Sequence, residues 1–370
     1  MSLLPKKIRF WLFDTLSLKT MRYVDVIPRH KATGLVAEIY HQIEHDFFIN
    51  GSLTSRSQIP SLLAAIWVAG RETILVDNKL DRTTKEAMAA TLSSINACPY
   101  CGDMLVSLVH AGDKPEAAMQ ILAQQEESIS DPVLCDRLTW LKAVTTPGAE
   151  TPSFIPFTEE ELPEAIGSIM AMGDVNRFSH VVMAGSPVSE PFGISHIKQW
   201  ALRRFGDELR TTHIEPLTPG EALPFLPHAE LPNDMQWASQ HPRIATALAR
   251  WTATVEREAQ SVVPAAVQKR VHEHLTQWQG EQMSLSRNWV EQEITGLSDS
   301  DKPLARLALL LAKASYQIDD KIIEDVLGAD KNQERFIRIL AWCSFTASRY
   351  VAKQIAHMTR QALQNQVKAA

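Results

Sequence analysis

Apolar side chains recur at helical spacing along most of the chain. In residues 30–48 the apolar positions that follow this period are Leu35, Val36, Ile39, Tyr40, Ile43 and Phe47. The run LARLALLLAKA, from residue 304 to 314, predicts a well-buried helix. Alternating β-branched runs bounded by glycine turns, which indicate strands, are scarce. The pattern therefore predicts an all-α fold.

The prolines mark a boundary within this helical pattern. Seven of the 20 prolines fall between Pro187 and Pro232, where extended backbone is favoured. We expect residues 187–234 to form a linker that contains one helix, around HIKQWALRRFGDEL. The predicted units are an N-terminal segment (1–29), a first helical domain (30–186), the linker, and a second helical domain (235–370).

The two predicted domains share a weak internal similarity. Each has a helix-rich block, an acidic turn, and then a helix that carries a polar residue followed by arginine. The corresponding pairs are Asn176-Arg177 and Ser348-Arg349. This pattern predicts two divergent copies of one helical unit.

Charge and composition narrow the class of protein. The net charge of −6 gives no basic footprint for nucleic acid or anionic lipid, so we expect neither as a partner. The longest apolar runs span about ten residues, whereas a membrane helix needs about twenty. The apolar stretch near the N-terminus is interrupted by Asp14, which argues against a signal peptide. Four cysteines are too few for a disulfide scaffold, and we expect a soluble, cytoplasmic protein.

Two of the four cysteines form a C-x-x-C pair, Cys98 and Cys101. Residues 83–86 have the form of a capping box, which predicts a helix that starts near residue 84. A second helix is expected from Pro99, a favoured first-turn residue, to Gly112, a favoured stop. Cys98 then lies at a helix N-terminus, where the helix dipole favours a thiolate.

A dithiol at this position suits redox chemistry. One thiolate attacks an oxidant, and the second sulfur closes a disulfide that a reductant reopens. Zinc binding is a second interpretation, but zinc usually needs a second ligand pair. A third interpretation is that the two cysteines are chemically inert. Cys135 and Cys343 stand alone among apolar residues, so we expect both to be buried.

The wider context of the pair resembles a known family. Glu86 lies twelve residues before Cys98, and INACPYC follows it. This arrangement resembles the AhpD-like / carboxymuconolactone decarboxylase superfamily, especially its peroxidase-related branch. The later run FTEEELPEAI…GDVNRF is similar to that branch's final helix pair. The resemblance covers residues 30–185, and residues 235–355 show a degenerate form of it that lacks the C-x-x-C pair.

The resemblance implies an all-helical homo-oligomer, a dimer or trimer of two-copy chains, without an organic cofactor. It implies thiol-dependent reduction of hydroperoxides, with a thiol reductant or a redox partner protein as the electron source. Cys101 would attack the peroxide, Cys98 would be the more exposed resolving thiol, and Glu86 would end a proton relay. Thioredoxin-type motifs suggest the opposite order of the two thiols, so the order stays open.

One position departs from the family pattern. The family commonly has a histidine four residues after the second cysteine, and this chain has Leu105 there. Losing a positioned base typically costs about 10²–10⁴-fold in rate. His110 would lie on the opposite side of the helix, where we expect a solvated histidine. His180, near the Asn-Arg pair, is a candidate replacement.

Several motifs have a simpler interpretation. Glu86 could cap its own helix, and Tyr100 is expected to pack or to line the substrate site. His41 and His45 match a zinc-peptidase pattern, but no third ligand is evident, so we expect no metal. The alternatives to a peroxidase are a decarboxylase-like lyase and a non-catalytic helical oligomer whose relay has been lost.

Overall fold

The computed structural model describes residues 20–149, 152, 154–186, 188, 195–213 and 215–369. Every regular element in these ranges is a helix, apart from an isolated β-bridge between Met21 and Met183. The predicted all-α fold is therefore confirmed. None of the helices in the same ranges is long and apolar enough to cross a membrane. The apolar N-terminal stretch lies outside the described residues.

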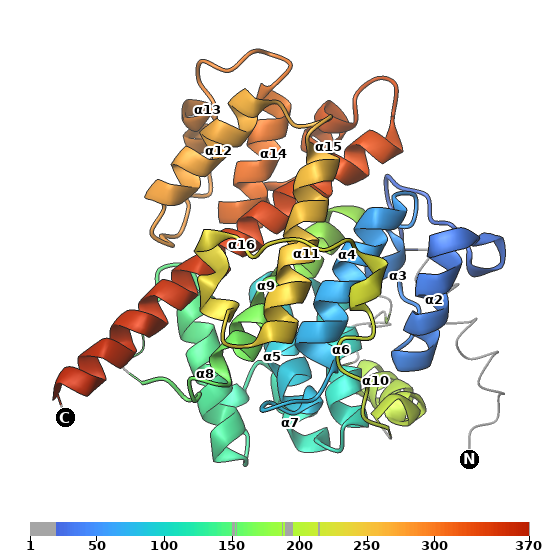
Figure 1. Cartoon of the computed structure of the whole chain (residues 1–370), viewed down its shortest axis with the longest axis vertical. Coiled ribbons are helices and arrows are strands. Elements are labelled where there is room, and N and C mark those ends of the chain that lie inside the picture. Colours follow the sequence, from blue (N-terminus) through green and yellow to red (C-terminus); the bar gives the residue numbers. More distant parts are fainter. Residues whose placement is uncertain are drawn as a thin grey trace.

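Helices follow one another in both parts of the chain (Figure 1). The first part contains α2 (Gly34–Asp46), α3 (Gly51–Thr54), α4 (Pro60–Gly70), α5 (Arg82–Ile95), α6 (Pro99–Ala111), α7 (Pro115–Leu122), α8 (Pro132–Thr145) and α9 (Leu162–Val182). The later part contains α10 (Ser195–Leu209), α11 (Pro242–Ala259), α12 (Ala265–Gln277), α13 (Asn288–Glu293), α14 (Lys302–Lys313), α15 (Asp320–Leu327) and α16 (Gln333–Ala369). Short helical turns lie between them: η1 (Arg29–Lys31), η2 (Arg71–Leu75, a π-helix), η3 (Glu126–Ser128), η5 (Arg210–His213), η6 (Leu223–Phe225), η7 (Asn233–Ala238) and η8 (Ser315–Gln317).

The start of α5 differs from the sequence prediction. The Asp81 side chain accepts a hydrogen bond from the Thr84 N–H at 2.9 Å, so the helix begins at Arg82 rather than near residue 84. Asp81 therefore caps α5, and the prediction of a capping box over residues 83–86 is wrong. The next helix, α6, begins at Pro99 and is followed by Gly112, as predicted.

The two long helices α9 and α16 pack against each other at the centre of the molecule (Figure 1). The contact is close at Gly173, where a Cβ atom would lie 3.2 Å from Ser348 Oγ. Asp174 of α9 pairs with Arg56 at 2.7 Å and accepts a hydrogen bond from Ser344 of α16 at 2.6 Å. Burial raises the pKa of Asp174, although the Arg56 charge opposes this shift.

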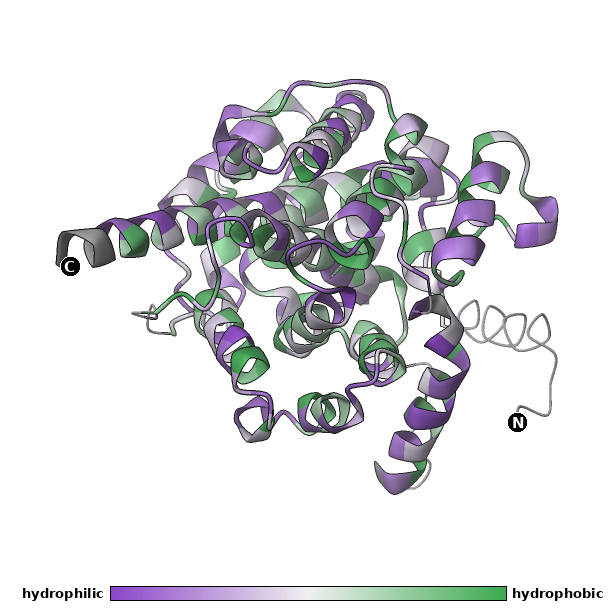
Figure 2. Ribbon diagram, turned by 60° about the horizontal axis from the view of Figure 1, so that its bottom comes forward, coloured by the Kyte–Doolittle hydropathy of each residue, from purple (hydrophilic) through white to green (hydrophobic). Residues whose placement is uncertain are grey.

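One apolar core runs through both parts of the chain, and the hydropathy colouring in Figure 2 places most polar positions on the outer surfaces of the helices. Around the central pair, α9 packs on α4 and α5, while α16 packs on α11 and α14. The helix α4 also packs on α11. Packing does not reveal common ancestry, so the two-copy organisation and the domain boundaries stay predictions.

The segment expected to be a linker packs on the cysteine helix. Its helix α10 lies along α6 and comes so close at Gly206 that a Cβ atom would be 2.6 Å from the Ser107 carbonyl oxygen. His110 is consequently buried, with 8% of its surface exposed, and its Nε2 lies 3.1 Å from an Asp207 carboxylate oxygen. The expectation that His110 is a solvated surface residue is therefore wrong, because α10 covers that side of α6.

Candidate functional site

The dithiol lies at the N-terminus of α6, where Cys98 and Cys101 are joined in a disulfide with their Cα atoms 5.4 Å apart. The chain reverses between α5 and α6 through Ala97, whose φ of +51° lies in the left-handed region. The Cys98 N–H then donates to the Ser93 carbonyl oxygen at 2.9 Å. The connection from α5 therefore fixes Cys98 at the N-cap of α6, with Cys101 in its first turn.

Both cysteines of the pair are buried to the same extent. The exposed fraction is 2% for Cys98 and 3% for Cys101. The expectation that Cys98 is the more exposed thiol is wrong for this disulfide form, because α6 packs closely against α5.

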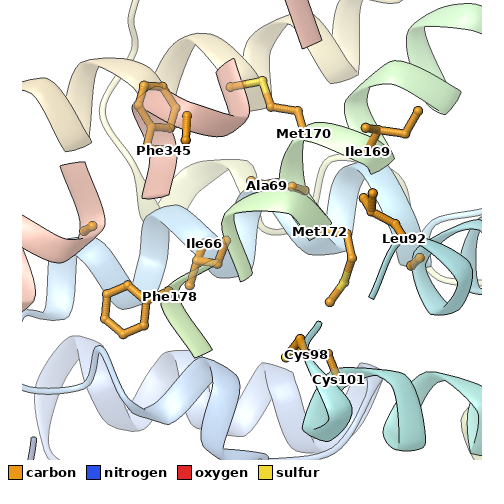
Figure 3. Packing of buried hydrophobic residues seen from close by; sticks show 14 of the residues in the cluster. Ile66, Ala69, Leu92, Cys98, Cys101, Ile169, Met170, Met172, Phe178 and Phe345 are labelled. Carbon is orange, nitrogen blue, oxygen red and sulfur yellow. A yellow bond between two sulfur atoms is a disulfide. The ribbon is translucent and has the colours of Figure 1, made fainter. Parts of the chain in front are cut away.

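An apolar cavity of about 90 Å³ adjoins the second cysteine. Its walls include Phe47, Leu53, Trp67, Tyr100, Met104, Leu105, Leu108, Met172 and Val175, and Cys101 lines it while Cys98 does not. Figure 3 shows the Met172 side chain reaching from α9 toward the two cysteines. The cavity offers Cys101 a neighbouring space that suits an apolar molecule.

Tyr100 holds one wall of this cavity in place. It is fully buried, and its hydroxyl oxygen accepts a hydrogen bond from the Gly51 N–H at 3.1 Å. The expectation that Tyr100 packs or lines the site is confirmed.

Glu86 is fully buried on α5 and makes two charged contacts. Its carboxylate accepts hydrogen bonds from Arg82 Nε and from His213 Nε2, both at 2.8 Å. Burial acts to raise the pKa of Glu86, but the Arg82 and His213 contacts outweigh it and hold the pKa below its usual range. Glu86 is therefore a charged carboxylate, and the interpretation that it caps its own helix is wrong.

His213 is the residue that sequence reasoning missed. It lies in η5, in the segment expected to be a linker, 127 residues after Glu86. No local pattern marks it, since it belongs neither to a periodic apolar face of a helix nor to a recognisable motif. The need for a partner arises from the burial of Glu86, which the structure shows, because a buried charge requires a partner within the fold.

Glu86 and the dithiol are separated along the pair of antiparallel helices. Thr83 contacts Gly112 at one end, where Thr83 Oγ1 lies 3.4 Å from the Gly112 carbonyl oxygen, and Ser93 lies beside Gly102 at the other. Cys101 is thus level with a point about eight residues beyond Glu86, or about 12 Å along the axis at 1.5 Å per residue. Leu105 lies in the interval and lines the apolar cavity.

His180 does not join Glu86 to the thiols. Its Nδ1 lies 3.4 Å from the Ala97 carbonyl oxygen, and its Nε2 lies 3.1 Å from the Ser315 carbonyl oxygen. These contacts place His180 behind the turn that precedes Cys98. Both of its partners are backbone carbonyl oxygens, so His180 stabilises that turn.

The remaining cysteines and histidines form no second centre. Cys343 is buried, and burial raises the pKa of its thiol, whereas Cys135 is only half-buried, contrary to expectation. His45 pairs with Asp46 at 2.7 Å. Among the residues that the structure describes, no group of three or more His, Cys, Asp or Glu side chains could hold a metal ion.

Comparison with known proteins gives one curated relative. The chain is 27% identical over 349 residues to the alkyl hydroperoxide reductase Rv2159c of Mycobacterium tuberculosis, and the match covers 91% of this chain and 96% of that protein. No family model matches the chain. The similarity spans both helical parts and the segment between them.

Proposed function

We propose that this protein is a thiol-dependent peroxidase of the AhpD-like type that reduces organic hydroperoxides through Cys98 and Cys101. The observation that carries the proposal is the disulfide at the N-terminus of α6, beside an apolar cavity that Cys101 lines. The similarity to a protein named alkyl hydroperoxide reductase along nearly its whole length supports the same activity. A small-molecule thiol or a redox partner protein would return the pair to the dithiol.

Cys101 is the proposed attacking thiol. Its thiolate attacks one oxygen of the hydroperoxide, the O–O bond breaks, and the alcohol leaves after taking a proton. The Cys101 sulfenic acid then reacts with the Cys98 thiol, which forms the disulfide and releases water. Two electrons pass from the dithiol to the peroxide, and an external dithiol supplies two electrons and two protons to reopen the bond.

The start of α6 favours this chemistry on electrostatic grounds. Unpaired N–H groups and the helix dipole stabilise a thiolate in the first turn, which holds the Cys98–Cys101 pair. Helix N-termini and C-x-x-C motifs both favour the thiolate form, which is the nucleophile. The disulfide-forming pair also distinguishes this proposal from a decarboxylase-like lyase, which needs no such pair.

Glu86 is proposed as the proton-handling group of the site, with His213 as its partner. This pair carries the acid–base groups that the family places beside the thiol, but Leu105 leaves an apolar interval between the pair and Cys101. Loss of a positioned base costs about 10²–10⁴-fold in many enzymes. We therefore propose a peroxidase slower than relatives that carry histidine at that position.

Three further statements belong to the same proposal. The chain contains two divergent copies of one helical unit, it assembles as a dimer or trimer, and it works in the cytoplasm. The weak internal similarity, with Asn176-Arg177 and Ser348-Arg349 at corresponding places, supports the two-copy organisation.

Steady-state turnover tests the proposed activity. Purified full-length protein with excess dithiothreitol should consume cumene hydroperoxide, and Cys101→Ser should abolish this consumption. Cys135→Ser is the matched control and should keep the wild-type rate, because Cys135 lies outside the pair. Equal rates for wild type and Cys101→Ser would show that the dithiol is not the reacting group.

A further inference from the structure

A second cavity, of about 120 Å³, lies between the two parts of the chain. Its walls come from α5 and α9 on one side and from α14 and α16 on the other. The residues that line it include two cations, Arg177 and Lys313, and no Asp or Glu. The cavity is separate from the apolar space beside Cys101, since the two share no lining residue.

Arg177 lines this cavity, and among the described residues its hydrogen-bond acceptors are neutral oxygen atoms. Its Nε donates to the Leu311 carbonyl oxygen and its Nη1 to the Gly173 carbonyl oxygen, both at 3.1 Å, while Ser348 Oγ lies 3.5 Å from Nη1. Within the described part of the chain, no Asp or Glu forms an ion pair with its guanidinium. Burial lowers the pKa of Arg177 to about 10, although the charge of Asp174, one helical turn earlier, opposes this shift.

Arg349, the corresponding arginine of the second part, is paired with carboxylates. Arg349 binds Asp234 through two nitrogens, at 2.7 and 2.8 Å, and Glu256 through the third, at 2.7 Å. A guanidinium fork of this kind matches carboxylate geometry. Arg177 has the same fork in a partly buried place, but its third nitrogen, Nη2, has no hydrogen-bond partner among the described residues.

A second donor in the cavity also lacks a partner. The Asn96 Nδ2 atom is buried and has no acceptor among the described residues. Buried amide donors are nearly always hydrogen-bonded in native structures, so this atom needs an explanation. Lys313 cannot accept from it, because an ammonium only donates, and its Nζ donates to Glu293 at 2.9 Å.

We infer that this cavity binds the carboxylate of a small amphipathic acid, with Arg177 and Asn96 as the donors. The carboxylate would provide a direct anionic hydrogen-bond partner for Arg177 Nη2, since Asp174 acts on Arg177 only through its charge, and an acceptor for Asn96 Nδ2. The apolar walls, formed by residues such as Leu92, Ile169 and Val351, would hold an aromatic or short aliphatic body. One unpaired cation between apolar walls favours a monoanion over a phosphate dianion.

The position of the cavity brings such a ligand close to the turn before the dithiol. Asn96 immediately precedes Ala97, and Ser315, which lines the cavity, is joined through His180 to the Ala97 carbonyl oxygen. The inference does not depend on the proposed peroxidase activity, because the donors and walls of the cavity exclude both cysteines.

Calorimetric titration of the full-length chain with sodium benzoate tests the inference, with benzyl alcohol as the neutral ligand of similar shape. Wild type should bind benzoate about tenfold or more tightly than benzyl alcohol, and Arg177→Met should lose at least about tenfold in benzoate affinity. Arg257→Met removes an exposed arginine outside the cavity and should bind as wild type does.

Three results would overturn the inference. These are the absence of benzoate binding, equal benzoate affinity in wild type and Arg177→Met, and binding of inorganic phosphate as tight as that of benzoate. If circular dichroism shows that Arg177→Met is unfolded, Ala312→Phe decides the question, since it fills the cavity and keeps the charge. Loss of benzoate binding in that variant supports the site, and retained binding rejects it.

Discussion

Glu86 of α5 and His213 of η5, 127 residues apart in the chain, share a 2.8 Å hydrogen bond in the interior of the protein. The bond gives the buried carboxylate a histidine partner from a distant segment, while Leu105 occupies the position one turn after Cys101. It also ties the segment after α10 to the helix that precedes the dithiol. Glu86 and the cysteine pair lie toward opposite ends of the contact between α5 and α6.

The charge of Glu86 should contribute to stability in a pH-dependent way. Glu86→Gln removes the carboxylate that faces Arg82 and His213, and breaking a buried pair of this kind costs about 3–5 kcal/mol. The folded pKa of Glu86 lies below the ordinary value of 4.5, so this contribution is complete above about pH 4.5. It should decline as the pH falls from that value through the lowered folded pKa.

Urea unfolding of wild type and Glu86→Gln between pH 3 and 7 measures this difference. Glu127→Gln, which removes an exposed carboxylate, is the control and should leave the free energy of unfolding nearly unchanged. A Glu86→Gln penalty that stays constant down to pH 3, or grows, contradicts the assignment of a charged carboxylate.

A histidine at position 105 should raise the rate of the proposed peroxide reduction. Leu105→His places an imidazole one helical turn from Cys101, in the interval between the thiol and Glu86. A positioned base is worth about 10²–10⁴-fold, so a gain of at least about tenfold in kcat/KM for cumene hydroperoxide is expected. Stopped-flow or steady-state assays with dithiothreitol give the measurement.

Leu108→His is the matched control for that experiment. Leu108 lines the same cavity but lies farther along α6 from Cys101, so a histidine there should give no such gain. The account of the missing relay fails if a folded Leu105→His protein is no faster than wild type, or if both variants gain equally.

The contact between α10 and α6 should be sensitive to a single methyl group. Gly206→Ala would bring a Cβ atom within 2.6 Å of the Ser107 carbonyl oxygen and 2.7 Å of His110 Cδ2. Relief of this overlap requires α10 to shift, which typically costs about 1–3 kcal/mol. Chemical denaturation should therefore show a lower free energy of unfolding.

Gly70→Ala provides the opposite expectation in the same chain. Gly70 ends α4, and an added Cβ atom meets no other atom within 4 Å. Alanine at such a site stabilises helices by about 0.4–1 kcal/mol. Similar effects of the two substitutions would contradict the close approach of α10 to α6.

The sequence was most informative where the signal is local. The helix of the second cysteine starts at Pro99 and stops before Gly112, because proline and glycine act on their own turn of backbone. The all-α fold followed from apolar periodicity for the same reason. The cap of α5 is harder to predict, because Asp81, Thr83 and Thr84 all offer capping side chains within four positions.

The site could be predicted only in part. The C-x-x-C spacing indicates the dithiol, because this motif lies within four consecutive residues. The partner of Glu86 and the burial of His110 depend on how α10 and η5 fold back over α5 and α6. Contacts of that kind join distant segments, and no local pattern in a single sequence encodes them.

A single-turnover reaction tests the central claim most directly. Fully reduced protein, freed of reductant, is mixed with one equivalent of cumene hydroperoxide, and the products are measured by chromatography and by peptide mass spectrometry. The account predicts one cumyl alcohol and one Cys98–Cys101 disulfide per chain, with Cys135 and Cys343 still reduced. Persistence of the hydroperoxide, or alcohol formation while Cys98 and Cys101 remain free thiols, would contradict it.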